Sequence, residues 1–197
     1  MKTFVKLQCA ALAFALAGCA GISVVKVDSG ERLVGERLTV TLDGAWNHVS
    51  SKWMNGPHAQ TWTMDGLPLD QMLIYSGLQN DEAVHADLND SGKKAFKFRA
   101  DMQPDQIVAL FEGMLTRDGS TFKLKQLSPA PFAGAKGFRF QYTLTRKSDN
   151  LELTGIGGGG VDKGALYAIV YQAPKLMVTA KEQQRVNKII DSARVKG

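Results

Sequence analysis

The sequence has few cysteines and no hydrophobic run long enough to cross a membrane. Its two cysteines, Cys9 and Cys19, both lie near the N-terminus, so the rest of the chain contains no disulfide. The apolar stretch 7–16 is about half as long as the ~20 residues that a membrane-spanning helix needs. Charged residues make up only 22% of the chain and hydrophobic residues 44%, which is typical of a folded globular protein and excludes general disorder.

The excess of positive charge is small. The chain has 24 Lys and Arg against 19 Asp and Glu, a net charge of +5, and Lys2 and Lys6 fall in the N-terminal segment discussed next. Nucleic-acid binding requires a concentrated basic surface. We therefore expect no nucleic-acid partner.

The first 18 residues have the features of a signal peptide: two lysines, an apolar stretch and a small-residue end. The tetrad Leu16-Ala17-Gly18-Cys19 resembles the lipobox of bacterial lipoproteins. That resemblance implies cleavage before Cys19, a diacylglycerol on its thiol, and acyl chains that hold the protein on a membrane. Ala20 after the cysteine implies the outer membrane by the sorting rule of these lipoproteins. We expect a lipid-anchored envelope protein on the periplasmic face.

The mature chain divides into two parts. Residues 19–36 contain the lipidated N-terminus and a polar, glycine-containing tether, and residues 37–197 form one α+β domain. Two-residue alternation of apolar side chains predicts half-buried strands. These strands cover 38–42, 96–99, 122–125, 138–145, 151–159 and 165–172. Because both sets of alternating residues in 165–172 are apolar, this strand is predicted to be central and covered on both sides.

Two segments have helical periodicity. One begins at Pro104 and carries an apolar stripe to Leu115. The other begins at Thr179, which matches a capping box with Glu182, and its stripe runs to Ala193. Short turns between strands favour antiparallel pairing. The sequence therefore predicts an α+β fold, an antiparallel sheet covered by helices on both faces.

The end of the chain adds a family resemblance. The apolar strand 164–174, followed by the segment 189–194, resembles the last strand and terminal helix of the PsbP-like, or Mog-type, α/β/α sandwich. The likeness covers about 37–195. It implies a non-catalytic accessory or binding domain, with some members acting as assembly factors, and it carries over no binding residue.

Two motifs resemble ligand sites but lack the required context. Residues 155–160 satisfy G-x-G-x-x-G, but a strand follows instead of a helix, so we interpret the glycines as sites of close packing. Residues 87–92 resemble half of a calcium loop, but position twelve is Phe98, which favours a polar turn. The histidines lack metal-ligand spacing. No metal or other cofactor, and no enzymatic activity, is predicted.

Two groups of residues are candidates for binding. Trp46, His48, Trp53 and Trp62 could form an aromatic platform for a glycan or a partner, although burial in the core is the alternative that we favour. Basic residues opposite the predicted strand phenylalanines could form a patch for anionic lipid or an acidic partner, or simply a solvated face. These basic residues are Lys93, Lys97, Arg99, Lys123, Lys125 and Arg139.

These observations predict a lipid-anchored accessory or assembly factor that binds a protein partner in the envelope. The alternative is a periplasmic binder of a small molecule or glycan, or a hydrolase, that uses the Trp46–Trp62 region. A broad exposed patch would favour the first interpretation, and a deep pocket with convergent polar groups the second.

Overall fold

The computed structural model describes residues 21–51, 56, 58–85 and 95–196. Residues 1–20, with the predicted signal peptide and Cys19, lie outside this range, as do Trp53, Lys93 and the loop 87–92. The elements before the first helix are β1 (Ser23–Val27), β2 (Gly30–Val34), β3 (Leu38–Leu42), β4 (Trp46–Ser50), β5 (Ala59–Thr63) and β6 (Gln71–Leu78). The remaining elements are α1 (Pro104–Leu115), β7 (Thr121–Phe132), β8 (Ala135–Thr145), β9 (Glu152–Asp162), β10 (Ala165–Pro174), α2 (Ala180–Asp191) and β11 (Arg194–Val195).

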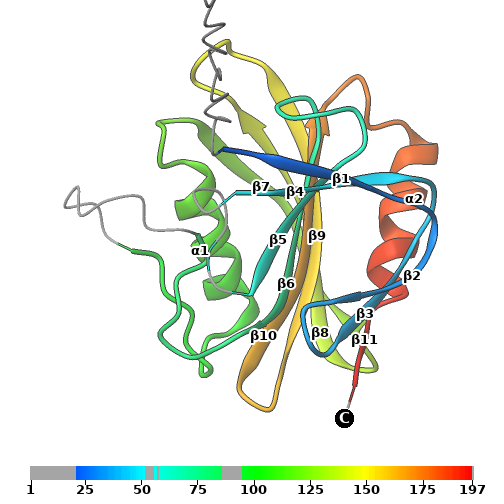
Figure 1. Ribbon diagram of the computed structural model, residues 1–197. Coiled ribbons are helices and arrows are strands. Elements are labelled where there is room, and N and C mark those ends of the chain that lie inside the picture. The colour runs from blue at the N-terminus through cyan, green and yellow to red at the C-terminus, as the bar shows by residue number, and fades with distance from the viewer. Residues whose placement is uncertain (1–20, 52–55, 57, 86–94, 197) are drawn as a thin grey trace, which may run out of the picture.

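The strands form two antiparallel sheets. Eight strands are arranged in the order β1-β4-β5-β6-β10-β9-β8-β7, and a smaller sheet has the order β11-β3-β2. Figure 1 shows α1 and α2 on opposite sides of the large sheet, with the small sheet on the α2 side. The part of the chain that the structure describes is therefore mostly antiparallel sheet with two helices. None of the described helices is long and apolar enough to cross a membrane.

β10 lies inside the large sheet, with β6 and β9 as its neighbours. Tyr167, Ile169 and Tyr171 pack into the core beneath α2, where they meet Val186 and Ile189. The alternate residues Leu166, Ala168 and Val170 pack into the second core beneath α1. The prediction of a central strand that is apolar on both sides is confirmed.

Both helices have the predicted positions. α1 begins at Pro104, and its stripe buries Ile107, Val108 and Phe111. At the start of α2 the hydroxyl of Thr179 accepts a hydrogen bond from the backbone N–H of Glu182 at 3.3 Å. The helices alone do not cover the two faces, however. Beside α2, the small sheet contributes Val34, Leu38 and Val40 to the same core, a layer that the sequence did not predict.

Two segments differ from the sequence prediction. The proposed tether contains β1, which pairs with β4, and β2, which pairs with β3. The valines and backbone groups of this segment therefore have partners, although its sequence shows no clear alternation. Residues 96–99 form no strand of the large sheet. Lys97 makes a single bridge to Ala83, and Phe98 is buried beneath α1. Phe96 packs partly buried against the same core, and the backbone of residues 96 and 98 is hydrogen-bonded to residues 81–84. The alternation therefore reflects a short extended segment outside the large sheet.

The glycine-rich segment forms β9 and allows aromatic rings to lie flat on the sheet. In the register of β8 and β9, Tyr142 is opposite Gly155 and Phe140 is opposite Gly157. A Cβ atom at either glycine would collide with the opposite ring. The ring centroids of Phe140 and Tyr142 are 5.9 Å apart, and Phe111 of α1 stacks on Phe140 at 6.0 Å. Gly155 and Gly157 thus have a packing role, and the groups that approach them are cross-strand rings.

Candidate functional site

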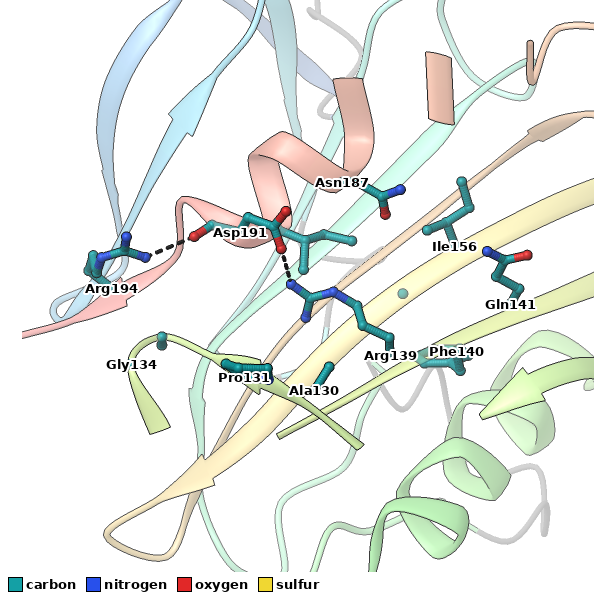
Figure 2. A pocket seen from close by; sticks show the side chains of 13 residues that line it. Ala130, Pro131, Gly134, Arg139, Phe140, Gln141, Ile156, Asn187, Asp191 and Arg194 are labelled. Carbon is teal, nitrogen blue, oxygen red and sulfur yellow. Dashed lines mark hydrogen bonds and ion pairs between the residues drawn. The ribbon is translucent and has the colours of Figure 1, made fainter. Parts of the chain in front are cut away.

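A groove of about 730 Å³ lies on the α2 side of the large sheet, between the C-terminal half of α2 and the β7–β8 hairpin. Figure 2 shows Asn187 and Asp191 extending from α2 toward the strands and Arg139 beneath them. The lining residues are Ala130, Pro131, Ala133 and Gly134 from the hairpin, Arg139, Phe140, Gln141, Ile156 and Gly157 from β8 and β9, and Asn187, Ile190, Asp191 and Arg194 from α2 and beyond.

The floor of the groove depends on a missing side chain. Arg139 of β8 pairs with Gly158 of β9, and its guanidinium lies where a side chain at position 158 would be. A Cβ atom on Gly158 would also come within 2.9 Å of the Ile190 side chain in α2. Glycine therefore lets the arginine lie flat between sheet and helix, and the apolar body of Ile190 covers it.

Arg139 is the central charged group of the groove. Its Nη2 donates a hydrogen bond to Asp191 Oδ1 at 2.6 Å, and its side chain is 19% exposed whereas that of Asp191 is 69% exposed. Among the described residues, its buried Nη1 has no hydrogen-bond partner. A guanidinium has five N–H donors, and a half-buried donor without an acceptor costs about 1–3 kcal/mol. The groove therefore contains a positively charged guanidinium, that of Arg139, whose hydrogen-bond donors are only partly used.

The surroundings of Arg139 combine apolar and polar groups. The Phe132 ring centroid lies 5.9 Å from its Cζ atom, within the range of a cation–π contact. Arg194 donates to the backbone oxygens of Asp191 at 2.8 Å and Ala193 at 2.6 Å, so its positive charge is placed at the C-terminal end of α2, where the helix dipole is negative. An apolar floor and a polar rim of this kind are suited to binding.

No protein-family profile matches the sequence, and no curated protein matches it. Among solved structures, cyanobacterial PsbP (CyanoP) from Synechocystis sp. PCC 6803 is 10% identical, with a TM-score of 0.49 over 91% of this chain and 95% of that chain. LpqN, involved in cell envelope biogenesis of Mycobacterium tuberculosis, is 11% identical, with a TM-score of 0.41 over 89% of this chain and 92% of that chain. Both TM-scores are below 0.5, and the proposals below rest on the geometry of this chain.

In the Trp46–Trp62 region, the described tryptophans are arranged according to the favoured alternative, burial in the core, and they form no aromatic platform. Trp46 and Trp62 are both buried in the core beneath α2, and Trp46 packs edge-on against Tyr171 with centroids 6.3 Å apart. His48 lies 5.4 Å from the Trp62 ring, and burial lowers the pKa of its imidazole. Indoles that stabilise the core cannot bind a glycan. Neither of these two indoles therefore presents an exposed face.

The basic residues do not form one patch. Lys123 and Lys125 are exposed on β7, which pairs with β8 as expected. Lys97 and Arg99 lie in the segment before α1, which is not a neighbouring strand of that sheet. Asp101 binds Arg99 at 2.8 Å, and Arg139 is paired with Asp191 in the groove. Asp101 and Asp191 lie outside the alternating strand positions on which the predicted patch was based. They neutralise the charges of Arg99 and Arg139.

Sequence reasoning found Arg139 but missed its partners. Asn187 and Asp191 are four residues apart, so they lie on one face of α2 beside the buried stripe of Val186, Ile189 and Ile190. This four-residue spacing was the one signal in the sequence that could have placed Asn187 and Asp191 side by side. Within the described ranges, no group of three or more His, Cys, Asp or Glu could hold a metal ion.

Proposed function

We propose that this protein is a lipid-anchored accessory factor of the bacterial cell envelope that acts by binding a partner protein in the Arg139 groove. The observation that carries the proposal is the partly buried Arg139, which is held by a single exposed carboxylate on an open, largely apolar floor. This arrangement provides recognition. We propose binding as its role in place of catalysis, because the groove brings together an ion pair and amide groups without a nucleophile beside a base.

The chemistry of the groove favours a partner segment with an acidic group. A carboxylate is the natural planar partner of a guanidinium, and one from a partner can replace that of Asp191. Because Asp191 is 69% exposed, its loss to solvent costs little. On the hairpin side of the groove, Ala130, Pro131 and Gly134 are small and apolar, so this side fits an extended segment with short side chains next to the acid.

The anchor is the second part of the proposal. Its support is the tetrad Leu16–Cys19 placed after the apolar stretch. The acyl chains would keep the protein on a membrane, where a partner anchored in the same membrane is available at high local concentration.

Site-specific photo-crosslinking in cells tests the binding site. A benzophenone amino acid at Asn187, which is exposed on the rim, is expected to capture a discrete partner, and the same group at Lys181 of α2, away from the groove, is not. Arg139→Gln should abolish the Asn187 adduct, whereas Asp191→Asn, which leaves the arginine in place, should retain or increase it. An adduct that is insensitive to Arg139→Gln would contradict the proposal.

Mass spectrometry tests the anchor. The mature N-terminus should be Cys19 carrying a diacylglycerol, and Cys19→Ala should leave an unprocessed chain. A free thiol at Cys19 on a full-length polypeptide would contradict the envelope assignment, while leaving the crosslinking result to be judged separately.

A further inference from the structure

The first described strand begins very close to the proposed lipid anchor. Three residues separate Cys19 from Ser23, where β1 starts, and the distance between the two Cα atoms is at most about 14 Å when the chain is fully extended. Because β1 is paired with β4 along its whole length, it cannot serve as part of a long tether. If Cys19 is acylated, as the proposed function holds, the start of β1 must lie next to the bilayer.

The end of the molecule at which β1 begins also exposes leucines. Figure 1 shows the start of β1 at the upper end, together with the β5–β6, β8–β9 and β10–α2 connections. Leu67 and Leu69 in the first of these loops are 37% and 46% exposed, and Leu176 in the last is 95% exposed. Exposed apolar side chains that gather at one end of a domain can mark a site of membrane contact.

The β5–β6 loop is held in place by a buried carboxylate. Asp70 Oδ1 accepts hydrogen bonds from the Thr63 hydroxyl at 2.6 Å and the Asp65 N–H at 2.8 Å, and Oδ2 accepts from the Met64 N–H at 2.8 Å. Asp70 itself is buried. This network fixes the loop, so that the leucines beyond it are exposed in a defined conformation.

The loop before α2 is fixed in the same way. The Lys175 N–H donates to the Glu152 carbonyl oxygen at 3.0 Å, and the Met177 N–H donates to the Pro174 carbonyl oxygen at 2.8 Å. Met177 packs against the core beneath α2. Leu176 between them is therefore directed outward by its bonded neighbours, not by disorder.

β1 adds apolar surface at its free edge. Ile22, Val24 and Val25 are all more than half exposed, and β1 is an outer strand of the large sheet. The charged groups of the neighbouring loops are largely paired with each other, as Arg146 is with Asp149 at 2.6 Å and Lys175 with Glu152 at 2.8 Å. This end therefore offers apolar side chains more than net charge.

We propose that this end of the domain rests on the phospholipid bilayer, with Leu67, Leu69, Leu176 and the exposed residues of β1 in the interfacial layer. The contact is driven by burial of apolar side chains, so it does not depend on anionic lipid. The β7–β8 hairpin and the Arg139 groove then lie toward the opposite end, turned away from the anchored membrane (Figure 1).

Environment-sensitive labels on single introduced cysteines test this orientation in the lipidated chain. Acylation occupies Cys19, so Leu176→Cys provides one reactive thiol, and Leu33→Cys provides a matched control near the β2–β3 turn at the other end. In vesicles of phosphatidylethanolamine and phosphatidylglycerol, the label at 176 should shift its emission to the blue and lose most of its iodide quenching. The label at 33 should keep the quenching that it has in an unlipidated chain from which residues 1–19, with both natural cysteines, have been removed.

The outcomes separate this inference from the proposed function. Equal iodide quenching of the two labels in a sample whose Cys19 is acylated by mass spectrometry would overturn the orientation and leave the anchor intact. An unmodified Cys19 would overturn both. Vesicles of phosphatidylcholine alone should give the same protection at 176, and protection only on anionic vesicles would contradict the apolar mechanism. The double variant Leu67→Glu, Leu69→Glu should restore quenching at 176 without releasing the lipidated chain.

Discussion

The carboxylate of Asp191, at the end of α2, lies 2.6 Å from the guanidinium of Arg139, in the middle of β8. This pair connects the last helix to the strand hairpin across a groove that both elements line. Since the carboxylate is largely exposed and the arginine is not, the pair can open on the aspartate side while the arginine stays in place.

The two members of this pair should therefore respond differently to substitution. Asp191→Asn should lower the unfolding free energy by no more than about 1 kcal/mol, the usual value of a partly exposed ion pair, and should retain partner binding. Arg139→Gln should abolish binding. Urea denaturation and the crosslinking yield at Asn187 measure the two effects. A loss of binding in Asp191→Asn as complete as in Arg139→Gln would show that the pair acts as a unit.

Gly157→Ala should destabilise the domain, because its Cβ atom would collide with the Phe140 ring. Overpacking of a core by one methyl group costs about 1–3 kcal/mol. Phe140→Leu removes part of the ring, so the double variant should lose less stability than the sum of the two single variants. Additive losses in chemical denaturation would mean that the glycine and the ring are not in contact.

Thr179→Ala should shorten or weaken α2, because the helix would lose the hydrogen bond from the Glu182 N–H to the Thr179 hydroxyl. Loss of such an N-cap costs about 0.5–2 kcal/mol. Thr179→Ser keeps the hydroxyl and should remain close to the natural chain in thermal and urea unfolding. If serine and alanine destabilise equally, the cap has no stabilising role.

The Arg146–Asp149 pair should give a stability contribution that depends on pH. The hydrogen bond from the Arg146 side chain lowers the pKa of Asp149 to about 2, from an ordinary value of 3.8. The contribution of the ion pair to the free energy of unfolding is therefore complete above pH 3.8 and is lost as the pH falls toward 2. The difference in unfolding free energy between the natural chain and Asp149→Asn should be constant from pH 5 to 7 and shrink below pH 4. A difference that grows on acidification would contradict this assignment.

Local patterns in the sequence were sufficient for part of the fold. Two-residue alternation found the later strands, and the bounds of α1 and α2 followed from Pro104, Thr179 and the apolar stripes. The same reasoning missed β6, Gln71–Leu78, because nearly all its residues are buried and show no alternation. It also missed β1, whose pairing with β4 is a property of the assembled sheet.

The candidate site was less accessible to sequence reasoning. Arg139 and Asp191 are separated by 52 residues, and their contact depends on α2 lying across β8 and β9. Trp46 and Trp62 drew attention because tryptophan is frequent in binding sites, yet both are buried in the core. The packing of the helices and strands decides which polar or aromatic cluster faces a groove. No local sequence pattern contains that information.

The outer strand β7 pairs only with β8 among the large-sheet strands, and none of the described strands pairs with its other edge. Two prolines, Pro129 and Pro131, lie in this strand, and its register shifts between Leu124 and Gln126. Proline has no N–H to offer a further strand, and irregular, lysine-bearing edges discourage edge-to-edge pairing. A protein crowded on a membrane is thereby protected from aggregation along the strand beside its proposed binding groove.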